Sequence, residues 1–176
     1  QDQIVASFGG AQTIRMGPGP KWVVEPLIVS REYIEYFQKY MLVGFSGIDR
    51  LADGHAKKKI SNIRNKSVTS ELEQIAELST TAHSLLQKNV EMEEIGKLLD
   101  TGWRLKRTLS TSLAMEWMDQ IYDSGIRCGA FGGKLMGAGG GGFFYFLAPP
   151  STHQSIREAL PQVKVWIPFA IDFSGS

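Results

Sequence analysis

Cysteine and net charge are both scarce in this sequence. A single cysteine, Cys128, occurs among 176 residues, which excludes an internal disulfide framework and any zinc site built from several cysteines. The sequence therefore predicts a cytoplasmic protein rather than a small secreted domain. Lysine and arginine number 19 against 18 aspartates and glutamates, a net charge of +1. No overall field is available to hold DNA, RNA or an anionic membrane, so neither nucleic acid nor a membrane is an expected partner.

Long apolar runs are also missing. The longest run, Phe143 to Ala148, is far shorter than the roughly 20 residues that cross a bilayer. The composition, 43% hydrophobic and 21% charged, is instead typical of a globular fold. The first residues, Gln1 to Gln3, resemble no targeting segment, and we expect a further part of the protein to lie upstream of them.

The N-terminal third predicts strands around one helix. Turn residues at 17–20 divide the segment 11–29 into two strands of a hairpin. Ser30 is the expected N-cap of the helix that follows, and a short strand is expected at 41–45. Apolar residues spaced by three and four form the buried face of that helix: Tyr33, Ile34, Phe37 and Tyr40.

Three helices are predicted in the middle of the chain. Ser70, followed by Glu73, has the spacing of a capping box, and Asn89 is the expected cap of the second helix. A third helix is expected from 114 to 122, stopped near Gly125. Cations near the end of the second helix suit the negative pole of its dipole: Arg104, Lys106 and Arg107.

The C-terminal part mixes strands and a helix, so the fold class is α+β. A glycine-rich loop precedes a strand at 143–147, a helix at 151–160 and a strand at 163–173. Pro168 predicts that the last strand lies at a sheet edge or carries a bulge. Its core face is expected to hold Val163, Val165, Ile167, Phe169 and Ile171.

Glycines are concentrated before the strand at 143–147. Nine of the chain's 19 glycines lie between Gly125 and Gly142. Glycine loses more backbone entropy on folding than other residues, so such a run needs a cause. Backbone N–H groups without side chains form a concavity that binds phosphate, and Lys134 adds a positive charge. The alternative is a tight turn or bulge that leads into a buried strand.

The string Gly133-Lys-Leu-Met-Gly-Ala-Gly-Gly-Gly-Gly-Phe143 resembles the third motif of the GHMP kinases, the galactose, homoserine, mevalonate and phosphomevalonate kinase superfamily. Gln1-Asp-Gln3, followed by Phe8-Gly-Gly10, resembles the sugar-kinase segment that carries a catalytic aspartate. Gly102-Trp-Arg-Leu-Lys-Arg107 is similar to the heptose-phosphate kinase branch, with fucose kinases as near relatives. The resemblance covers most of the chain.

This resemblance implies a GHMP kinase C-terminal ferredoxin-like α/β sandwich, preceded by the last strands of an N-terminal, ribosomal S5-like domain. The boundary is expected near residue 30, with 1–30 closing the first domain and 31–176 forming the second. The family's main phosphate loop, Gly- and Ser-rich, has no counterpart here. The chain is therefore expected to be the C-terminal part of a kinase, inactive without the N-terminal half as its partner.

The implied reaction transfers phosphate from ATP to a sugar or sugar phosphate, with heptose 7-phosphate at its anomeric hydroxyl as the favoured substrate. Asp2 is the implied catalytic residue, and Mg²⁺ is expected to bind in the N-terminal half. The residues expected to contact ATP are Gly137, Gly139, Gly140, Gly141 and Gly142. Those expected to contact the substrate are Lys134, Arg104, Lys106 and Arg107.

Other interpretations remain open at this point. A non-catalytic module that binds an anionic metabolite or a partner chain through the glycines is the alternative to a kinase. The cations of the second middle helix also suit the helix dipole without any ligand, and the basic run 57–66 fits a solvated surface. Trp103 and Trp117 are expected in the core rather than against a sugar. Heptose 7-phosphate, fucose and other hexoses all fit the sequence.

Overall fold

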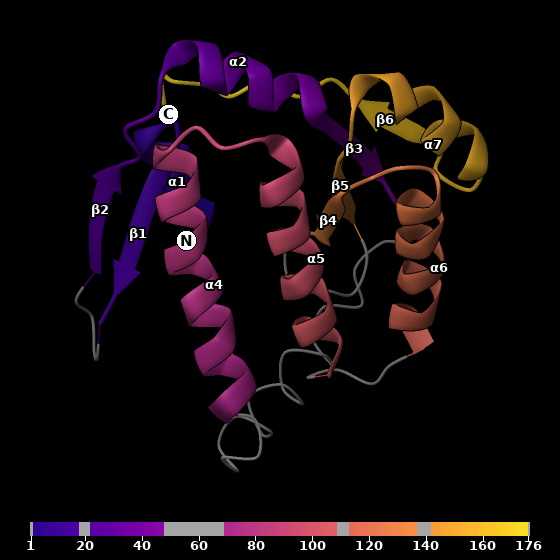
Figure 1. Ribbon diagram of the computed structural model, residues 1–176, viewed down its shortest axis with the longest axis horizontal. Coiled ribbons are helices and arrows are strands. Elements are labelled where there is room, and N and C mark those ends of the chain that lie inside the picture. The colour runs from indigo at the N-terminus through magenta and orange to yellow at the C-terminus, as the bar shows by residue number, and fades with distance from the viewer. Residues whose placement is uncertain (1, 18–21, 48–68, 109–112, 137–141, 176) are drawn as a thin grey trace.

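The computed structural model describes residues 2–17, 22–47, 69–108, 113–136 and 142–175. A small two-stranded sheet lies near the N-terminus, and a four-stranded sheet with helices packed on it forms the rest (Figure 1). The N-terminal group comprises α1 (Asp2–Phe8), β1 (Gln12–Met16) and β2 (Trp22–Pro26). The remaining elements are α2 (Arg31–Tyr40), β3 (Met41–Phe45), α4 (Thr69–Gln87), α5 (Met92–Thr108), α6 (Leu113–Arg127), β4 (Gly132–Leu135), β5 (Phe143–Leu147), the 3₁₀ turn η1 (Pro150–Thr152), α7 (His153–Ala159) and β6 (Val165–Ile167).

The first two strands confirm the predicted hairpin. β1 and β2 pair antiparallel, with Ile14 opposite Val24. The larger apolar side chains toward the hairpin tip are exposed, because only the two strands themselves form this sheet: Met16, Trp22 and Val23. A two-stranded sheet is marginal by itself, so the hairpin depends on contacts with the rest of the chain.

The larger sheet has the order β4-β5-β3-β6, and every neighbouring pair is antiparallel. β3 occupies the predicted residues and lies between β5 and β6. Because side chains alternate along a strand, Phe144 and Phe146 of β5 face one side of the sheet and Phe143, Tyr145 and Leu147 the other.

Two clusters of buried side chains hold the helices on this sheet. The first joins α5, α6 and α7 to Phe144 and Phe146, and it includes Trp103, which is 5% exposed as expected of a core residue. The second surrounds Leu147 and draws on α2 and the start of α5: Tyr33, Met92 and Ile95. The fold is therefore the predicted α+β arrangement.

The helix starts agree with the sequence in some places and differ in others. Ser30 caps α2 as predicted, since its hydroxyl accepts the N–H of Tyr33 at 3.1 Å. α4 begins at Thr69, one residue before the predicted cap Ser70. The prediction for Asn89 is wrong: this residue has φ +52 in the turn after α4, and α5 begins only at Met92.

α6 also differs, because it continues past Gly125 to Arg127. Gly125 is buried against the ring of Phe146, and a Cβ atom there would lie 2.3 Å from Cζ of that ring. The glycine therefore serves helix–sheet packing instead of ending the helix. The positive φ expected after a helix end occurs further on, at Gly129, with φ +101.

Two strands correct the sequence-based interpretation. Residues 132–135, expected within a loop, form strand β4. The last strand, β6, spans only Val165–Ile167 and lies at a sheet edge, as Pro168 predicted. Its predicted core face is wrong within the strand, since Val165 and Ile167 are exposed and Trp166 packs against the first cluster, whereas Val163, just before the strand, is buried as predicted.

After β6 the chain returns to the N-terminal hairpin. The N–H of Ile171 donates to Oε1 of Gln38 on α2 at 2.7 Å. The N–H of Gly10 then donates to the carbonyl oxygen of Asp172 at 2.6 Å. Backbone lies against backbone here, because a Cβ atom on Gly9 would be 2.4 Å from the nitrogen of Gly175. The C-terminal segment thus links α2 to the hairpin.

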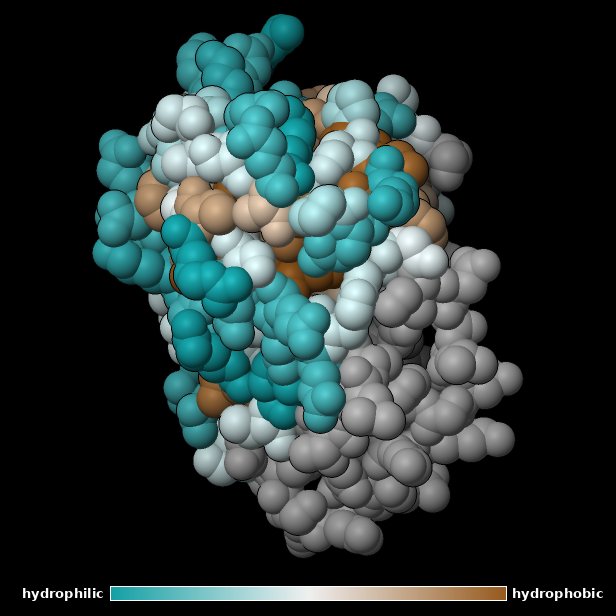
Figure 2. Space-filling view, turned by 90° about the vertical axis from the view of Figure 1, so that its right-hand side faces the viewer, coloured by the Kyte–Doolittle hydropathy of each residue, from teal (hydrophilic) through white to brown (hydrophobic). Residues whose placement is uncertain are grey.

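The side of the molecule formed by α6 and α7 is mainly hydrophilic over its described part, with hydrophobic side chains visible between the polar ones (Figure 2). Within the described ranges, no helix combines the length and apolar character that crossing a membrane requires.

Candidate active site

The glycine-rich segment connects two strands that pair with each other. β4 and β5 form an antiparallel hairpin, and the N–H of Met136 extends the ladder by donating to the carbonyl of Phe143 at 2.8 Å. Four of the glycines expected to contact ATP lie outside the described residues: Gly137, Gly139, Gly140 and Gly141. The fifth, Gly142, is described and immediately precedes β5.

Gly142 has a backbone conformation that requires glycine. Its φ is +95, and a Cβ atom built on it would meet no described atom within 4 Å. Positive φ combined with open space is what close approach of a ligand to the main chain needs. The N–H of Gly142, however, already donates to Oγ of Ser46 at 3.0 Å. The N–H of Gly142 is therefore engaged within the protein, while no described atom lies next to its α-carbon.

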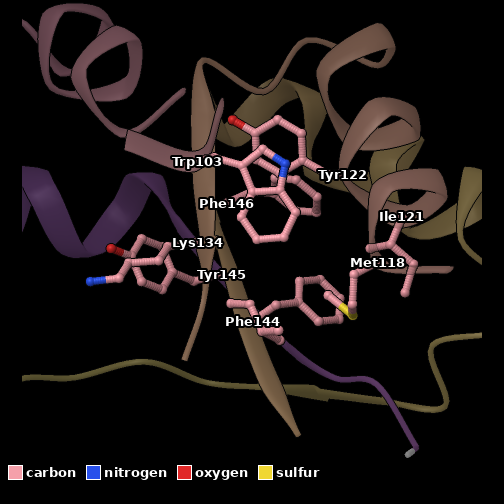
Figure 3. Close-up of a pocket in the computed structure, with 9 residues that line it drawn as sticks. Trp103, Met118, Ile121, Tyr122, Lys134, Phe144, Tyr145 and Phe146 are labelled. Carbon is pink, nitrogen blue, oxygen red and sulfur yellow. The ribbon is translucent and has the colours of Figure 1, made fainter. Parts of the chain in front are cut away.

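Lys134 lies two residues before the end of the ladder, opposite Tyr145. Both side chains extend away from Phe144 and Phe146, from the other face of the hairpin (Figure 3). The amine of Lys134 is exposed and makes no ion pair with any residue of the described ranges. Burial raises the pKa of the neighbouring Tyr145 to about 12, so its phenol stays protonated at neutral pH. Lys134 is thus placed to meet an anion near the glycines.

A small cavity lies on the opposite face of the same hairpin (Figure 3). Its volume is about 10 Å³, and its lining includes Trp103, Met118 and Ile121. This space holds at most one water molecule, so it accommodates no sugar and no nucleotide. The indole of Trp103 is stacked on Tyr122, with centroids 4.9 Å apart and planes at 17°. Trp103 is therefore a core residue rather than a sugar platform.

Helix α5 runs alongside β4 in the same direction. Gly96 packs on Phe131 and Gly132 at the start of β4, and Trp103, two turns later, lines the same cavity as Leu135 at the end of β4. The C-terminal end of α5 therefore lies at the end of the hairpin that carries the glycines. The three cations expected to contact substrate are in this last part of the helix: Arg104, Lys106 and Arg107.

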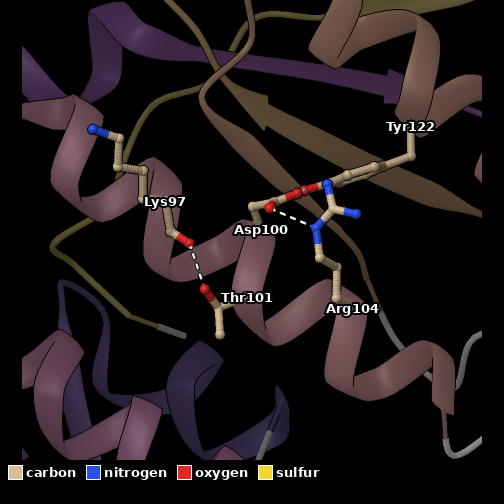
Figure 4. A network of polar contacts seen from close by, with 5 residues as sticks. All are labelled: Lys97, Asp100, Thr101, Arg104 and Tyr122. Atoms are coloured by element: carbon tan, nitrogen blue, oxygen red, sulfur yellow. Dashed lines mark hydrogen bonds and ion pairs between the residues drawn. The ribbon is translucent and has the colours of Figure 1, made fainter.

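Arg104 and Arg107 each form an ion pair within the chain. Nε of Arg104 donates to Asp100 at 2.7 Å, and the hydroxyl of Tyr122 donates to the other carboxylate oxygen at 2.8 Å (Figure 4). The hydrogen bond with Asp100 raises the pKa of Arg104, and burial, followed by the same carboxylate, raises the pKa of Tyr122. Arg107 pairs with Asp119 of α6. Both arginines are thus held by carboxylates of the chain. A substrate that contacts these arginines must therefore share them with the carboxylates.

The remaining predicted residues are placed as follows. Asp2 begins α1, and its side chain lies outside the described part of the structure. The basic run 57–66 also lies outside it. Within the described ranges, no three histidine, cysteine, aspartate or glutamate side chains gather into a group able to hold a metal ion.

Sequence reasoning missed Ser46, which follows β3 and contacts Gly142. The signal for it was weak. A serine followed by Gly47 after a short apolar strand usually indicates only a turn, and its partner is 96 positions away in sequence.

Comparison with known proteins agrees with this geometry. Residues 82–164, from α4 to the start of β6, match the model described as "GHMP kinases C terminal". A bifunctional fucokinase/GDP-fucose pyrophosphorylase from Arabidopsis thaliana is 31% identical over 152 residues, 84% of this chain and 14% of the relative. D-glycero-alpha-D-manno-heptose 7-phosphate kinase from Campylobacter jejuni is 26% identical over 172 residues, 91% of this chain and 47% of the relative.

A solved structure supports the fold. Mevalonate kinase from L. major, solved with R-mevalonate, matches 94% of this chain and 50% of its own, with a TM-score of 0.67 and 20% identity. The chain thus spans half or less of each of these three proteins. The fold is that of the C-terminal part of a GHMP kinase. Residues 82–164 thus match a GHMP kinase C-terminal domain, which confirms the predicted resemblance to that superfamily.

Proposed function

We propose that these residues form the C-terminal part of an ATP-dependent kinase that phosphorylates a sugar or sugar phosphate. The observation that carries the proposal is the glycine-rich connection of the β4–β5 hairpin within a GHMP kinase C-terminal domain. Two relatives are named for kinases of fucose and of heptose 7-phosphate. We favour heptose 7-phosphate, phosphorylated at its anomeric hydroxyl, because a phosphorylated substrate gives the exposed Lys134 a partner.

The proposed roles follow the placement of the residues. The backbone of Gly137, Gly139, Gly140 and Gly141 receives the phosphates of ATP, since a main chain without side chains allows close approach. Gly142 ends this segment, and its N–H donates to Ser46 rather than to the phosphates. Lys134, with the cations at the end of α5, attracts the anionic sugar: Arg104, Lys106 and Arg107.

Asp2 is proposed to orient the acceptor hydroxyl and to accept its proton. Mg²⁺ neutralises charge on the phosphates in such reactions. The described residues contain no group that fits it, so we place its ligands in the other half of the kinase. The matched region is less than half of each of the two named relatives, and we expect the remaining part of this kinase to be the partner that the domain needs.

The test is a phosphotransfer assay on the natural full-length protein. It is supplied with ATP, Mg²⁺ and, in turn, heptose 7-phosphate, fucose and other hexoses. We expect sugar-dependent release of ADP, fastest with heptose 7-phosphate. Gly140→Val should abolish it, because a branched side chain obstructs the phosphates and disfavours positive φ. Gly102→Ala is the matched control, since among the described residues its Cβ atom meets only Leu78, at 3.7 Å.

Three results would change the assignment. Faster turnover of fucose would keep the kinase and replace the substrate. Binding of ATP without turnover of any sugar would favour the non-catalytic binding module. Normal turnover and ATP affinity in a folded Gly140→Val variant would remove the phosphate role from the glycines.

A further inference from the structure

Ser46 stands out among the polar side chains. It follows β3, the strand between β5 and β6, and it is only 3% exposed. Apart from tyrosines, it is the one buried polar or charged residue in the described part of the chain. Gly47, directly after it, has φ +78, so the chain turns away from the sheet at this point. A buried hydroxyl at a strand end needs a partner inside the protein.

Ser46 and Gly142 share two hydrogen bonds, one of which uses the hydroxyl. The N–H of Ser46 donates to the carbonyl oxygen of Gly142 at 2.8 Å, which continues the β3–β5 ladder beyond the pair Phe45 and Phe143. In return, the N–H of Gly142 donates to the side-chain oxygen of Ser46 at 3.0 Å. A regular antiparallel pair would use the carbonyl of Ser46 instead. The hydroxyl thus replaces a main-chain acceptor.

This replacement explains the geometry of Gly142. Its φ of +95 takes it out of extended strand conformation, and Oγ of Ser46 still satisfies its N–H. Both main-chain polar groups of Gly142 are therefore engaged by one residue. An N–H already donated to Ser46 is not available to an anion, so Gly142 is suited to fix the end of the glycine-rich segment rather than to bind phosphate directly.

We infer that Ser46 is a positioning residue for nucleotide binding, which acts by holding Gly142. The inference rests on the proposed function. It adds to that function a division of the glycines into phosphate-contacting positions and one anchored position, Gly142. Loss of the Ser46 hydroxyl should loosen the anchor and weaken ATP binding while sugar binding is retained.

The experiment compares Ser46→Thr with Ser46→Val in the natural full-length protein. The two side chains have the same shape, but only threonine carries the hydroxyl acceptor. Ser46→Ala is added as the smallest change, and Ser155→Ala, an exposed position on α7, is the control. KM for ATP, KM for the sugar and kcat are measured, together with hydrogen–deuterium exchange of peptides that contain residue 142.

We expect Ser46→Val and Ser46→Ala to raise KM for ATP about tenfold, the usual scale for losing a buried hydrogen bond. KM for the sugar should change less than threefold, and Ser46→Thr should remain close to wild type in KM for ATP. Exchange near residue 142 should be faster in the valine and alanine variants only. If Ser46→Ala impairs folding, the comparison of Ser46→Thr with Ser46→Val still tests the inference, because these two side chains have the same shape.

The inference is overturned if folded valine and threonine variants show the same KM for ATP. Faster exchange in the valine variant with unchanged KM for ATP would show a purely structural role, and it would also overturn the inference. If the wild type itself neither binds nor uses ATP, the proposed function fails first, and the exchange data then show separately whether Ser46 holds Gly142.

Discussion

Asp2 is the residue on which the proposed phosphoryl transfer depends most. Asp2→Asn keeps the size of the side chain and removes its negative charge. If Asp2 accepts the proton of the sugar hydroxyl, kcat should fall by about 10² or more, the usual scale of general-base catalysis. KM for ATP and for the sugar should stay within a few-fold. Steady-state kinetics of the full-length protein measures all three.

The control for this substitution is Asp123→Asn, at an exposed position of α6, which should leave kinetics unchanged. A higher KM for the sugar with unchanged kcat would assign Asp2 to substrate binding. Unchanged kinetics would leave Asp2 as a residue at the start of a helix, where asparagine is an equally good cap.

The cations of α5 show how far a single residue type can be interpreted from sequence. Helix-dipole reasoning gave one explanation for Arg104 and Arg107, and ligand binding gave another. The structure adds a third, because Asp100 and Asp119 pair with them. Asp119 lies on the next helix, so spacing along α5 carries no sign of that pair. Ser46 was missed for the same reason, since its hydrogen bonds join residues far apart in sequence.

At the scale of elements, the contact between α5 and β4 depends on the absence of side chains. A Cβ atom on Gly132 would lie 2.0 Å from the carbonyl oxygen of Gly96, a distance that requires the backbone to move. Gly132→Ala should therefore destabilise the protein by about 2 kcal/mol or more, within the range of overpacked core sites. Urea unfolding, monitored by circular dichroism, gives the free energy of unfolding.

Gly102→Ala is the control on the same helix. Its new methyl group makes an ordinary contact, and alanine is the better helix former by roughly 0.5–1 kcal/mol. We expect unchanged or slightly higher stability. Equal effects of the two substitutions would show that close packing at Gly132 contributes nothing.

The same contact explains why β4 was not predicted. Its first two residues are Gly132 and Gly133, which have low strand propensity. They form a strand because tertiary packing demands it: a Cβ atom on Gly133 would lie 2.4 Å from the carbonyl oxygen of Tyr145. β3 and the hairpin were predicted because their signals are local. The last strand was predicted less well, because the chain leaves the sheet after Ile167, and alternation over 163–173 placed Val165 and Ile167 on the wrong face.

At the scale of the molecule, the C-terminal segment holds the N-terminal hairpin in place. Gly9 has φ +65, and a Cβ atom on it would lie 2.4 Å from the nitrogen of Gly175. Gly9→Ala should displace the segment and remove the hydrogen bond from Gly10 to Asp172. We expect a loss of about 2 kcal/mol or more, since the clash adds to a cost of roughly 1–2 kcal/mol for left-handed alanine. Hydrogen exchange at the Gly10 amide should become faster.

Gly47→Ala separates the cost of the left-handed backbone conformation from the cost of the steric clash. Its φ of +78 is similarly left-handed, yet a Cβ atom there meets no described atom within 4 Å. This control should show the conformational cost alone, and exchange at Gly10 should not change. If Gly9→Ala costs no more than Gly47→Ala, the close contact with Gly175 does not stabilise the hairpin.

The hydrogen bond between Gly10 and Asp172 also has a consequence for synthesis on the ribosome. The hairpin is synthesised some 160 residues before the segment that Gly10 contacts, and at about 5–20 residues per second this interval takes roughly 10 to 30 s. During that interval the N–H of Gly10 lacks its acceptor on Asp172, and the strand edges of the hairpin are available to other chains. The nascent protein should therefore need a chaperone most while its helices are still being made.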